Sequence, residues 1–395
     1  MSTIISSGQT VILKSGKLLS GAIVKGGSLL VSSGGETSAT QIQTGSETVS
    51  KGGKALHSEI TGGLQIVVNG GTASGTVVSN RGQEVLSSGG KSISATVKNG
   101  GKEVVSAGGT ASATIVNNGG ILVDGASAVV NGAKILNGGT IELTGGTFSG
   151  TIAVGGAEVV TSASNHKIYA ALAVKNGVTL TVSAGGKTSG TVISNGGIEI
   201  VGKGGTEASA SVLNGGEIVY AGGTVTAVSA HAGGTIGLAS GTVFTSKTIG
   251  AGVTLVVSGG AVASSTTLGT GATESIQFGG TLAGTTTLGA RSTLDDITTG
   301  NDVSLTVSGF GNGNTIDLVN FEAGVITSAF KASTGGAPGG VLTIMGTQRT
   351  ATIHLFGQYV AAGFHANDQG NSIIITYSKP AAEVGADLAA GGGHH

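Results

Sequence analysis

Residues 71–120 read GTASGTVVSNRGQEVLSSG, GKSISATVKNGGKEVVSAG and GTASATIVNNGG, which is one pattern written twice and begun a third time. The copies open at Gly71, Gly90 and Gly109, so the period is 19 residues. A fixed period of this size is typical of proteins built from stacked repeats. The repeat therefore indicates the class of fold before any single motif is considered.

Within each copy, the first run of residues is small and β-branched. Its eighth position holds Val78, Val97 and Val116, its sixth position holds Thr or Ala, and its fourth position is variable, as at Ile93. Side chains two residues apart lie on the same face of a strand. We therefore expect the fourth, sixth and eighth positions to share one face.

A turn of Asn and Gly follows, and then a second run rich in Val. Val85 and Val104 occupy matching places in this run, and we expect the preceding Glu84 and Glu103 to face the other way. The unit is thus interpreted as strand, loop, strand. Asn and Gly tolerate the positive backbone torsion angles of such turns best. This demand explains the glycine content, 77 of 395 residues, without a ligand.

The composition supports a narrow solenoid. Pro occurs only 2 times and no Gly-X-Y triplet runs through the chain, which excludes collagen, while recurring Val and Ile argue against disorder. Aromatic residues make up 3% and Trp is absent, so each coil must bury small aliphatic side chains against its neighbours. We predict an all-β fold, a right-handed parallel β-helix with repeats of 18 to 19 residues and a β-rich C-terminal cap.

Charge and cysteine content restrict the function classes. The net charge is −1, and the 19 Lys and Arg are spread along the chain, which gives no electrostatic footprint for nucleic acid. The absence of Cys removes disulfides and thiol chemistry and is compatible with export. No apolar run reaches the length of a membrane helix, about 20 residues, and the N-terminus lacks a basic region followed by an apolar one. We therefore expect either that the chain is not exported through such a signal or that the signal lies outside this sequence. The final GGGHH resembles a tag remnant, so His394 and His395 are set aside.

The chain divides into four predicted segments. Residues 1–34 are read as irregular N-terminal coils and residues 35–300 as β-helix repeats, with a looser period between 121 and 185. Residues 301–378 hold five of the eight Phe and are read as a β-rich cap. Residues 379–395 are expected to be a disordered tail with the tag remnant.

The units SGTVVSNRGQEVLSSGG, SATVKNGGKEVVSAGG and SGTVISNGGIEIVGKGG resemble the strand-loop-strand repeats of AIDA-type autotransporter passengers, a family of self-associating bacterial surface adhesins. The resemblance covers about residues 35–300 and implies a parallel β-helix outside a Gram-negative cell, where it promotes adhesion, aggregation or biofilm growth. Some relatives carry sugars on repeat Ser or Thr. Such autotransporters end in a membrane barrel, for which no room remains after residue 378, so we expect a missing barrel or another secretion route.

Enzymes that cut acidic polysaccharides also use parallel β-helices, with charged clusters on one outer face. The nearest candidates here are Asp295 and Asp296, with Arg291 close in sequence. Adjacent residues on a strand point to opposite faces, so at most one of the two acids would join a shared site. We interpret them as solvated acids near the junction with the cap. The scarcity of aromatic side chains, on which sugars stack, also disfavours an enzyme.

Metal and phosphate sites are not indicated either. Residues 311–318, GNGNTIDL, resemble a turn of a calcium-binding β-roll, but Asp317 is their only carboxylate, which favours a simple strand-entry turn. The five histidines before the final pair lack the short paired spacing of a zinc site; they are His57, His166, His231, His354 and His365. The glycine turns lack the GxxxxGK[ST] pattern of phosphate loops. We assign no catalytic, cofactor-binding or metal-binding residue.

The remaining chemistry is that of the surface. Outward Ser, Thr, Asn and Lys suit many weak contacts with an identical rod, and multivalency turns weak contacts into tight attachment. The sequence favours a non-enzymatic extracellular adhesin or scaffold at the bacterial cell surface. Its expected partners are itself or surface glycans and proteins, without nucleic acid, membrane insertion or cofactor. A polysaccharide-acting enzyme and a passive stalk or secreted matrix component remain the alternatives.

Overall fold

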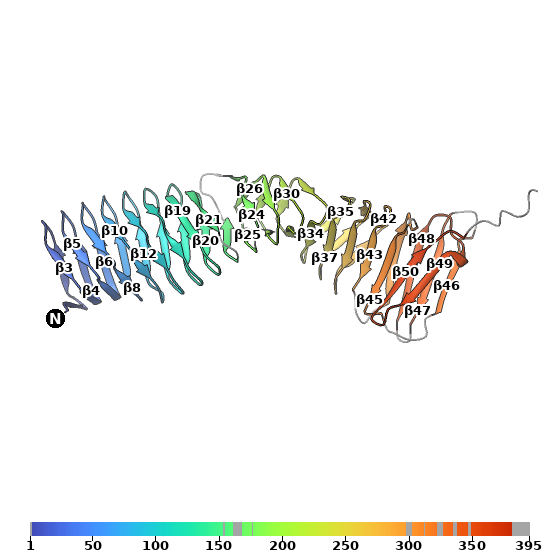
Figure 1. Cartoon of the computed structure of the whole chain (residues 1–395), viewed down its shortest axis with the longest axis horizontal. Coiled ribbons are helices and arrows are strands. Elements are labelled where there is room, and N and C mark those ends of the chain that lie inside the picture. Colours follow the sequence, from blue (N-terminus) through green and yellow to red (C-terminus); the bar gives the residue numbers. More distant parts are fainter. Residues whose placement is uncertain are drawn as a thin grey trace, which may run out of the picture. The chain divides into compact units, whose positions relative to one another are not determined.

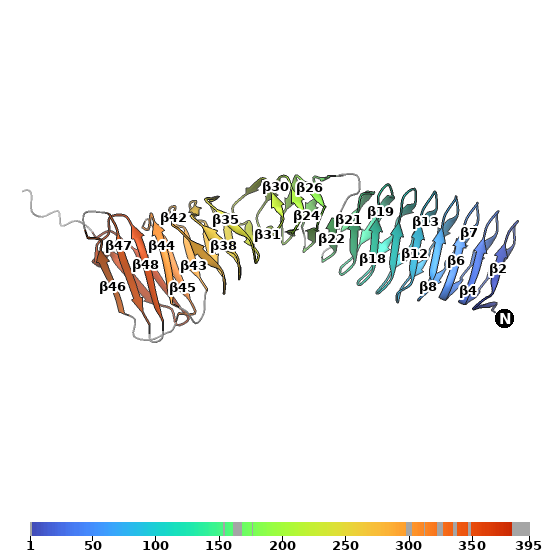
Figure 2. The same cartoon turned by 180° about the vertical axis from the view of Figure 1, so that it is seen from behind.

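The computed structural model is built almost entirely from β-strands, which stack like rungs when viewed from either side (Figures 1 and 2). It describes residues 2–152, 155–160, 168–175, 177–297, 302–311, 313–321, 327–334, 338–346 and 349–380. The chain separates into two compact units, residues 1–229 and 230–395, which are described one at a time. No helix in the described part is long and apolar enough to cross a membrane.

In the regular part of the first unit, each coil contributes three short strands. They are β7 (Lys54–Leu56), β8 (Glu59–Ile60), β9 (Leu64–Val67), β10 (Thr72–Ser74), β11 (Val77–Val78), β12 (Gln83–Leu86), β13 (Lys91–Ile93), β14 (Thr96–Val97), β15 (Lys102–Val105), β16 (Thr110–Ser112), β17 (Ile115–Val116) and β18 (Ile121–Asp124). Thr72 pairs in parallel with Lys91, and Lys91 with Thr110, so one coil advances 19 residues, as predicted. The predicted parallel β-solenoid is confirmed.

A sharp bend separates the first and second strands of each coil. Gly75, Ser94 and Ala113 lie at this bend with φ angles of 67°, 56° and 56°, in the left-handed region. The bend interrupts the alternation of side chains, so Ile93 before it is 44% exposed, whereas Val97 after it is buried. The prediction that the fourth position shares the inner face was therefore wrong, and the predicted first strand is two strands.

The interior of the coils is narrow and filled by stacked columns of one residue per coil. Val78, Val97 and Val116 form one such column, and Leu86 and Val105 belong to another; all are 0% exposed. Neighbours in a column lie one strand spacing apart, about 4.8 Å, so their methyl groups pack in continuous contact. The predicted inward position of the eighth residue is confirmed.

The same ladders extend in both directions within the first unit. Before the regular coils lie β1 (Ile4–Ser6), β2 (Thr10–Leu13), β3 (Leu18–Ser20), β4 (Ile23–Val31), β5 (Glu36–Ser38) and β6 (Gln41–Val49). After them lie β19 (Val129–Ile135), β20 (Thr140–Leu143), β21 (Thr147–Ile152), β22 (Ala157–Val160), β23 (Tyr169–Ala170), β24 (Ala173–Val174), β25 (Thr179–Val182), β26 (Lys187–Ser189), β27 (Thr191–Ile193), β28 (Ile198–Gly202), β29 (Thr206–Glu207), β30 (Ala210–Val212), β31 (Glu217–Ala221), β32 (Thr224–Val225) and β33 (Val228–Ala230). Parallel pairing already begins with β1 on β4, inside the segment predicted as irregular.

The second unit starts as a solenoid and ends in antiparallel strands. Its strands are β34 (Thr235–Leu238), β35 (Val243–Thr245), β36 (Thr248–Ile249), β37 (Thr254–Val257), β38 (Val262–Ser264), β39 (Thr267–Leu268), β40 (Thr273–Ile276), β41 (Thr281–Ala283), β42 (Thr286–Leu288), β43 (Thr293–Asp296), β44 (Val303–Ser308), β45 (Thr315–Val319), β46 (Thr327–Ala332), β47 (Gly340–Met345), β48 (Thr350–Phe356), β49 (Phe364–Asp368) and β50 (Ser372–Tyr377), with the 3-10 helix η1 (Ala361–Gly363). β45 continues the parallel ladder of β43, and β50 and β49 then add to it in antiparallel fashion. Likewise β44 pairs in parallel with β48, which carries β47 and β46 in antiparallel pairing.

The predicted segment boundaries at residues 34, 300 and 378 stay predictions. Most of the predicted tail, residues 381–395 with the two final His, lies outside the described residues.

Candidate functional site

The outer face of the third strands carries a strip of apolar side chains, one per coil. Ile66 of β9 pairs with Val85 of β12, Val85 with Val104 of β15, and Val104 with Val123 of β18. Ile66, Val85 and Val104 are half-buried on the surface of the coils, whereas Val123 at the end of the row is only 9% exposed. We call these four residues the outer strip; it is straight because the register does not shift between coils.

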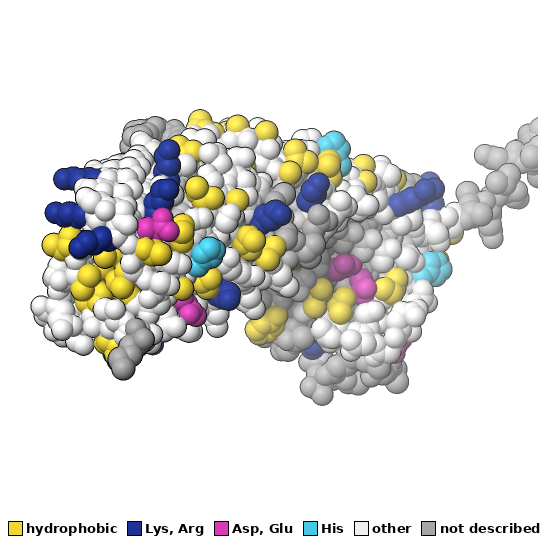
Figure 3. Space-filling view, turned by 60° about the vertical axis from the view of Figure 1, so that its left-hand side comes forward, with side chains coloured by type: hydrophobic (Ala, Val, Ile, Leu, Met, Phe, Trp, Pro, Cys, Tyr) yellow, Lys and Arg dark blue, Asp and Glu magenta, His cyan; other side chains and the backbone are white. Residues whose placement is uncertain are grey.

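The column beside the outer strip mixes polar and apolar residues. This column holds Leu64, Gln83, Lys102 and Ile121 in register. Much of the surface in Figure 3 is uncharged, with few carboxylates on the face shown. The first strands form a different outer face. On that face Thr72 lies in register between Lys54 and Lys91 of the neighbouring coils. The third-strand face is thus the less charged of the two.

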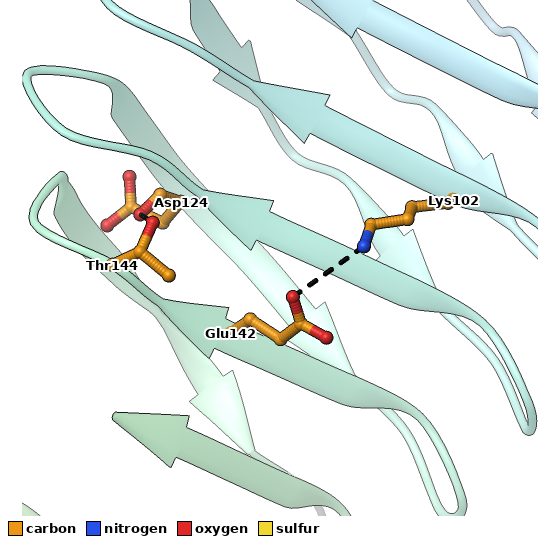
Figure 4. A network of polar contacts seen from close by, with 4 residues as sticks. All are labelled: Lys102, Asp124, Glu142 and Thr144. Carbon is orange, nitrogen blue, oxygen red and sulfur yellow. Dashed lines mark hydrogen bonds and ion pairs between the residues drawn. The ribbon is translucent and has the colours of Figure 1, made fainter. Parts of the chain in front are cut away.

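Charge pairing on this face is sparse. The Lys102 ammonium lies 3.7 Å from the Glu142 carboxylate two coils away, and both side chains are about one third exposed (Figure 4). Such an exposed pair adds little stability, typically below about 1 kcal/mol. Nearby, the Thr144 hydroxyl donates to the backbone carbonyl of Asp124, 3.1 Å away (Figure 4).

Acidic side chains lie inside the solenoid, which contradicts the predicted direction of Glu84 and Glu103. In the third strands, Leu29, Glu47, Gln65, Glu84 and Glu103 stack in one inner column, and all are 0% exposed. Alternation along the strand then turns the following residues, such as the half-buried Val of the outer strip, to the surface. The expected orientation was wrong because the strand buries its second and fourth residues.

The first carboxylate of this column is fully hydrogen-bonded. Glu47 accepts from the Thr37 hydroxyl at 2.7 Å, from the Ser58 hydroxyl at 3.0 Å and from the Gln65 amide at 2.6 Å. Gln65 in turn accepts from Thr76 at 3.1 Å. Burial raises the pKa of Glu47, and these hydroxyl and amide donors offset part of that rise. The hydroxyls of Thr37 in β5 and of Ser58 just before β8, with the Gln65 amide, therefore offset the cost of burying a carboxylate in the inner column.

The next two carboxylates have no such network. Glu84 and Glu103 are adjacent in the column, and none of their carboxylate oxygens meets hydrogen-bond geometry with a described residue, nor do the facing hydroxyls of Ser92 and Thr114. Burial raises the pKa of Glu84 well above its usual range, and the neighbouring Glu103 raises it further. Burial raises the pKa of Glu103 to about 7. The pair is therefore expected to hold protons near neutral pH.

Similar buried acids recur further along the chain. In the first unit, burial raises the pKa of Glu199 to about 8, with Glu207 contributing. The Thr191 hydroxyl donates to Glu207 at 3.0 Å and lies within 3.5 Å of Glu199. In the second unit, burial raises the pKa of Glu274 to about 7, although the Thr266 hydroxyl lies 2.9 Å from its carboxylate. The inward second position of the third strand thus holds Glu in several coils and an apolar residue in others, such as Leu122 and Ile141.

The acids singled out from the sequence are divided between two faces of β43, as predicted, but their interpretation as solvated acids was wrong for Asp296, which the strand buries. Asp296 is 5% exposed and turned inward, whereas Asp295 faces outward. The structure adds a partner that the sequence analysis missed, because Asp295 pairs in register with Asp317 of the next coil. Burial, and then the charge of Asp317, raise the pKa of Asp295 to about 6. Arg291 lies at an exposed turn with a φ of 57°.

The segment predicted as a strand-entry turn leads directly into β45. Its Asn314 is buried, accepts from the amide of Gly311 at 2.9 Å and donates to the Ser292 hydroxyl at 3.0 Å. These bonds tie the turn to the preceding coil. Across the described residues, no group of three or more His, Cys, Asp and Glu is placed to hold a metal ion.

The described histidines lie on the surface, at separate places in the two units. The exposed ones are His57, His231, His354 and His365. His365 lies 3.1 Å from the Ser378 hydroxyl. His166 lies outside the described residues.

Comparisons with known proteins were made against family models, curated sequences and solved structures. No family model matches the chain, and no curated protein matches it. Among solved structures, the chain is similar to the crystal structure of a fragment of TibA that is hyper-glycosylated by TibC. The two are 25% identical, the match covers 80% of this chain and 90% of that one, and the TM-score is 0.32. The strand register of the chain itself shows the parallel β-solenoid.

Proposed function

We propose that the chain is a non-enzymatic extracellular adhesin or scaffold that associates with copies of itself through the outer strip. The observation that carries this proposal is the register of Ile66, Val85 and Val104, which places half-buried apolar side chains in a straight row. The resemblance of the repeats to AIDA-type passengers supports the same function and a location at the bacterial cell surface.

The physical basis is the repetition of one weak contact. Each apolar side chain that loses water on association contributes about 25 cal/mol for every Å² of apolar surface removed. A single Val gains too little to hold two chains together once the cost of association is included. A row of identical spacing on both partners, however, brings the contacts together at once, and each contact formed makes the next one intramolecular.

The test is sedimentation of the purified chain over a wide concentration range, with paired Lys substitutions on two faces. We expect Val85→Lys with Val104→Lys to abolish concentration-dependent growth of the particle, because like charges would face each other across the contact. Thr72→Lys with Thr110→Lys adds the same charge to the first-strand face and should leave association unchanged.

The salt dependence gives a second readout. An apolar contact is expected to persist or strengthen between 0.1 and 1 M NaCl, roughly a threefold fall in Debye length, whereas a charged contact would weaken. A chain that stays monomeric at every concentration would refute self-association and favour the passive stalk. Equal effects of the two Lys pairs would refute the assignment to the outer strip.

A further inference from the structure

The cap of the second unit contains a cleft of about 390 Å³ beside its aromatic residues. The cleft is lined by Phe310, Gly311, Gly313, Gln358, Tyr359, Tyr377, Ser378 and Lys379. These residues come from the end of β44, the start of the turn into β45, the loop after β48 and the end of β50. A volume of this size falls in the range of small-molecule sites, roughly 300–1,000 Å³.

The aromatic rings around the cleft are concentrated in a chain that otherwise has few. Three Phe and two Tyr contact one another here: Phe310, Phe330, Phe364, Tyr359 and Tyr377. Tyr359 and Tyr377 stand at 86° to each other with ring centroids 5.0 Å apart, and Phe364 packs 4.8 Å from Tyr377. Phe310 is 4% exposed, whereas the two Tyr are half-buried. The two Tyr therefore form an accessible right-angled corner, and both pack against Phe364.

The two Tyr hydroxyls have complementary hydrogen-bonding capacity left. The Tyr359 hydroxyl donates to the Phe356 carbonyl at 3.3 Å, so its oxygen can still accept. The Tyr377 hydroxyl accepts from the Val360 amide at 3.3 Å, so its hydrogen can still be donated. Burial raises the pKa of Tyr359, which keeps this hydroxyl neutral. An amide, a hydroxyl and an ammonium complete the rim at Gln358, Ser378 and Lys379.

A purely structural role for this cluster explains part of the arrangement. Rings between the two sheets of the cap would complete its core, and the buried Phe310 fits that role. A core, however, fills its volume at high packing density and does not leave a hollow of this size beside half-buried Tyr. The open corner with polar groups around it is the composition of a binding site.

We propose that this cleft binds a sugar ring that carries a carboxylate. A pyranose has an apolar face of C–H groups that packs on an aromatic ring, and hydroxyls that bond to amide and hydroxyl groups at its edge. The Lys379 ammonium provides the charge complement for a carboxylate. The cleft belongs to the second unit and the outer strip to the first, so the proposal does not depend on self-association.

The test is titration of the full chain with glucuronic acid and with glucose, followed by saturation-transfer NMR and calorimetry. We expect the acidic sugar to bind at least tenfold more tightly. Lys379→Gln, at an exposed position, should weaken glucuronic acid about tenfold and leave glucose unchanged. Tyr377→Phe, which retains the ring, should weaken both sugars.

Phe278→Ala is the matched control, because Phe278 is a 68% exposed ring at a different cleft of the same unit. Its binding should equal that of the unmodified chain. Absence of binding by the unmodified chain, equal affinity for the two sugars, or equal loss in Phe278→Ala would each overturn the proposal. Self-association measured on the same samples distinguishes this outcome from a failure of the proposed function.

Discussion

Replacement of Glu103 by Gln is expected to stabilise the first unit above neutral pH. The folded chain keeps a proton on this carboxyl up to about pH 7, whereas the unfolded chain loses it near the ordinary value of 4.5. Stability therefore falls as the pH rises from 4.5 to 7, because the unfolded state binds fewer protons over that interval. At 1.36 kcal/mol per pKa unit, the penalty at pH 8 is about 3 kcal/mol.

The chain itself shows that Gln is accepted in this column. Gln65 donates to the Glu47 carboxylate below it at 2.6 Å. Gln at position 103 would stand in the same relation to Glu84, donating to a carboxylate whose oxygens now lack hydrogen-bond geometry. The substitution should thus remove one buried charge and satisfy a second carboxylate without a change of volume.

The assay is urea unfolding at pH 4 and pH 8, with hydrogen exchange of the β12 and β15 amides as a local readout. Glu103→Gln should match the unmodified chain within about 1 kcal/mol at pH 4 and exceed it by about 3 kcal/mol at pH 8. Glu142→Gln, on the outer face, should change stability by less than about 1 kcal/mol at either pH. If Glu103→Gln leaves the pH dependence intact, or lowers stability at pH 8, the reasoning is refuted.

Two further predictions concern close approach and the acidic pair of the second unit. Gly90→Ala should cost roughly 1–3 kcal/mol, because a Cβ there would overlap the carbonyl oxygen of Val67 in the coil beneath. Gly202→Ala, where the nearest atom is at an ordinary 3.5 Å, should lie within about 1 kcal/mol of neutral; similar unfolding midpoints for the two variants would contradict this. Asp295→Asn should reduce the loss of stability of the second unit between about pH 4 and pH 6, because Asn has no acidic proton whose pKa differs between the folded and unfolded states. Thermal unfolding at pH 4 and pH 7 measures it, and an unaltered difference between the two midpoints would count against the assignment.

The period and the inner valines could be predicted from the sequence because they depend on repetition alone. Val78 and Val97 recur at one position, and stacked repeats bury whatever recurs. The orientation of Glu84 was not predicted, because ionisable side chains are almost never fully buried without partners. A signal was nevertheless present: Leu86 lies two residues after Glu84, so the two share a face, and Leu86 is the larger apolar residue of the run.

The cleft of the cap depended on pairing that no local pattern reveals. The sequence located aromatic residues in the cap, but Phe310 and Tyr377 are brought near each other only because β50 returns to pair with β45. Some 50 residues separate β45 from β50, and their antiparallel pairing is set by tertiary packing. The pattern within a window of a few residues does not contain this information. The same holds for Asp295 and Asp317, which are adjacent only through the coil register.

The constant register has a consequence for how such a chain changes its length over generations. A duplicated segment of 19 residues, copied in frame, supplies a coil whose strands match those of both neighbours. Which coil is copied nevertheless matters to the fitness of the product. A second copy of the coil that holds β20, whose inner residues Ile141 and Leu143 are both apolar, adds only hydrocarbon there, whereas a copy of the coil that holds Glu103 adds another buried acid beside an existing one. Selection is therefore expected to retain duplications of coils whose inner residues are apolar more often than duplications of coils that bury an acid.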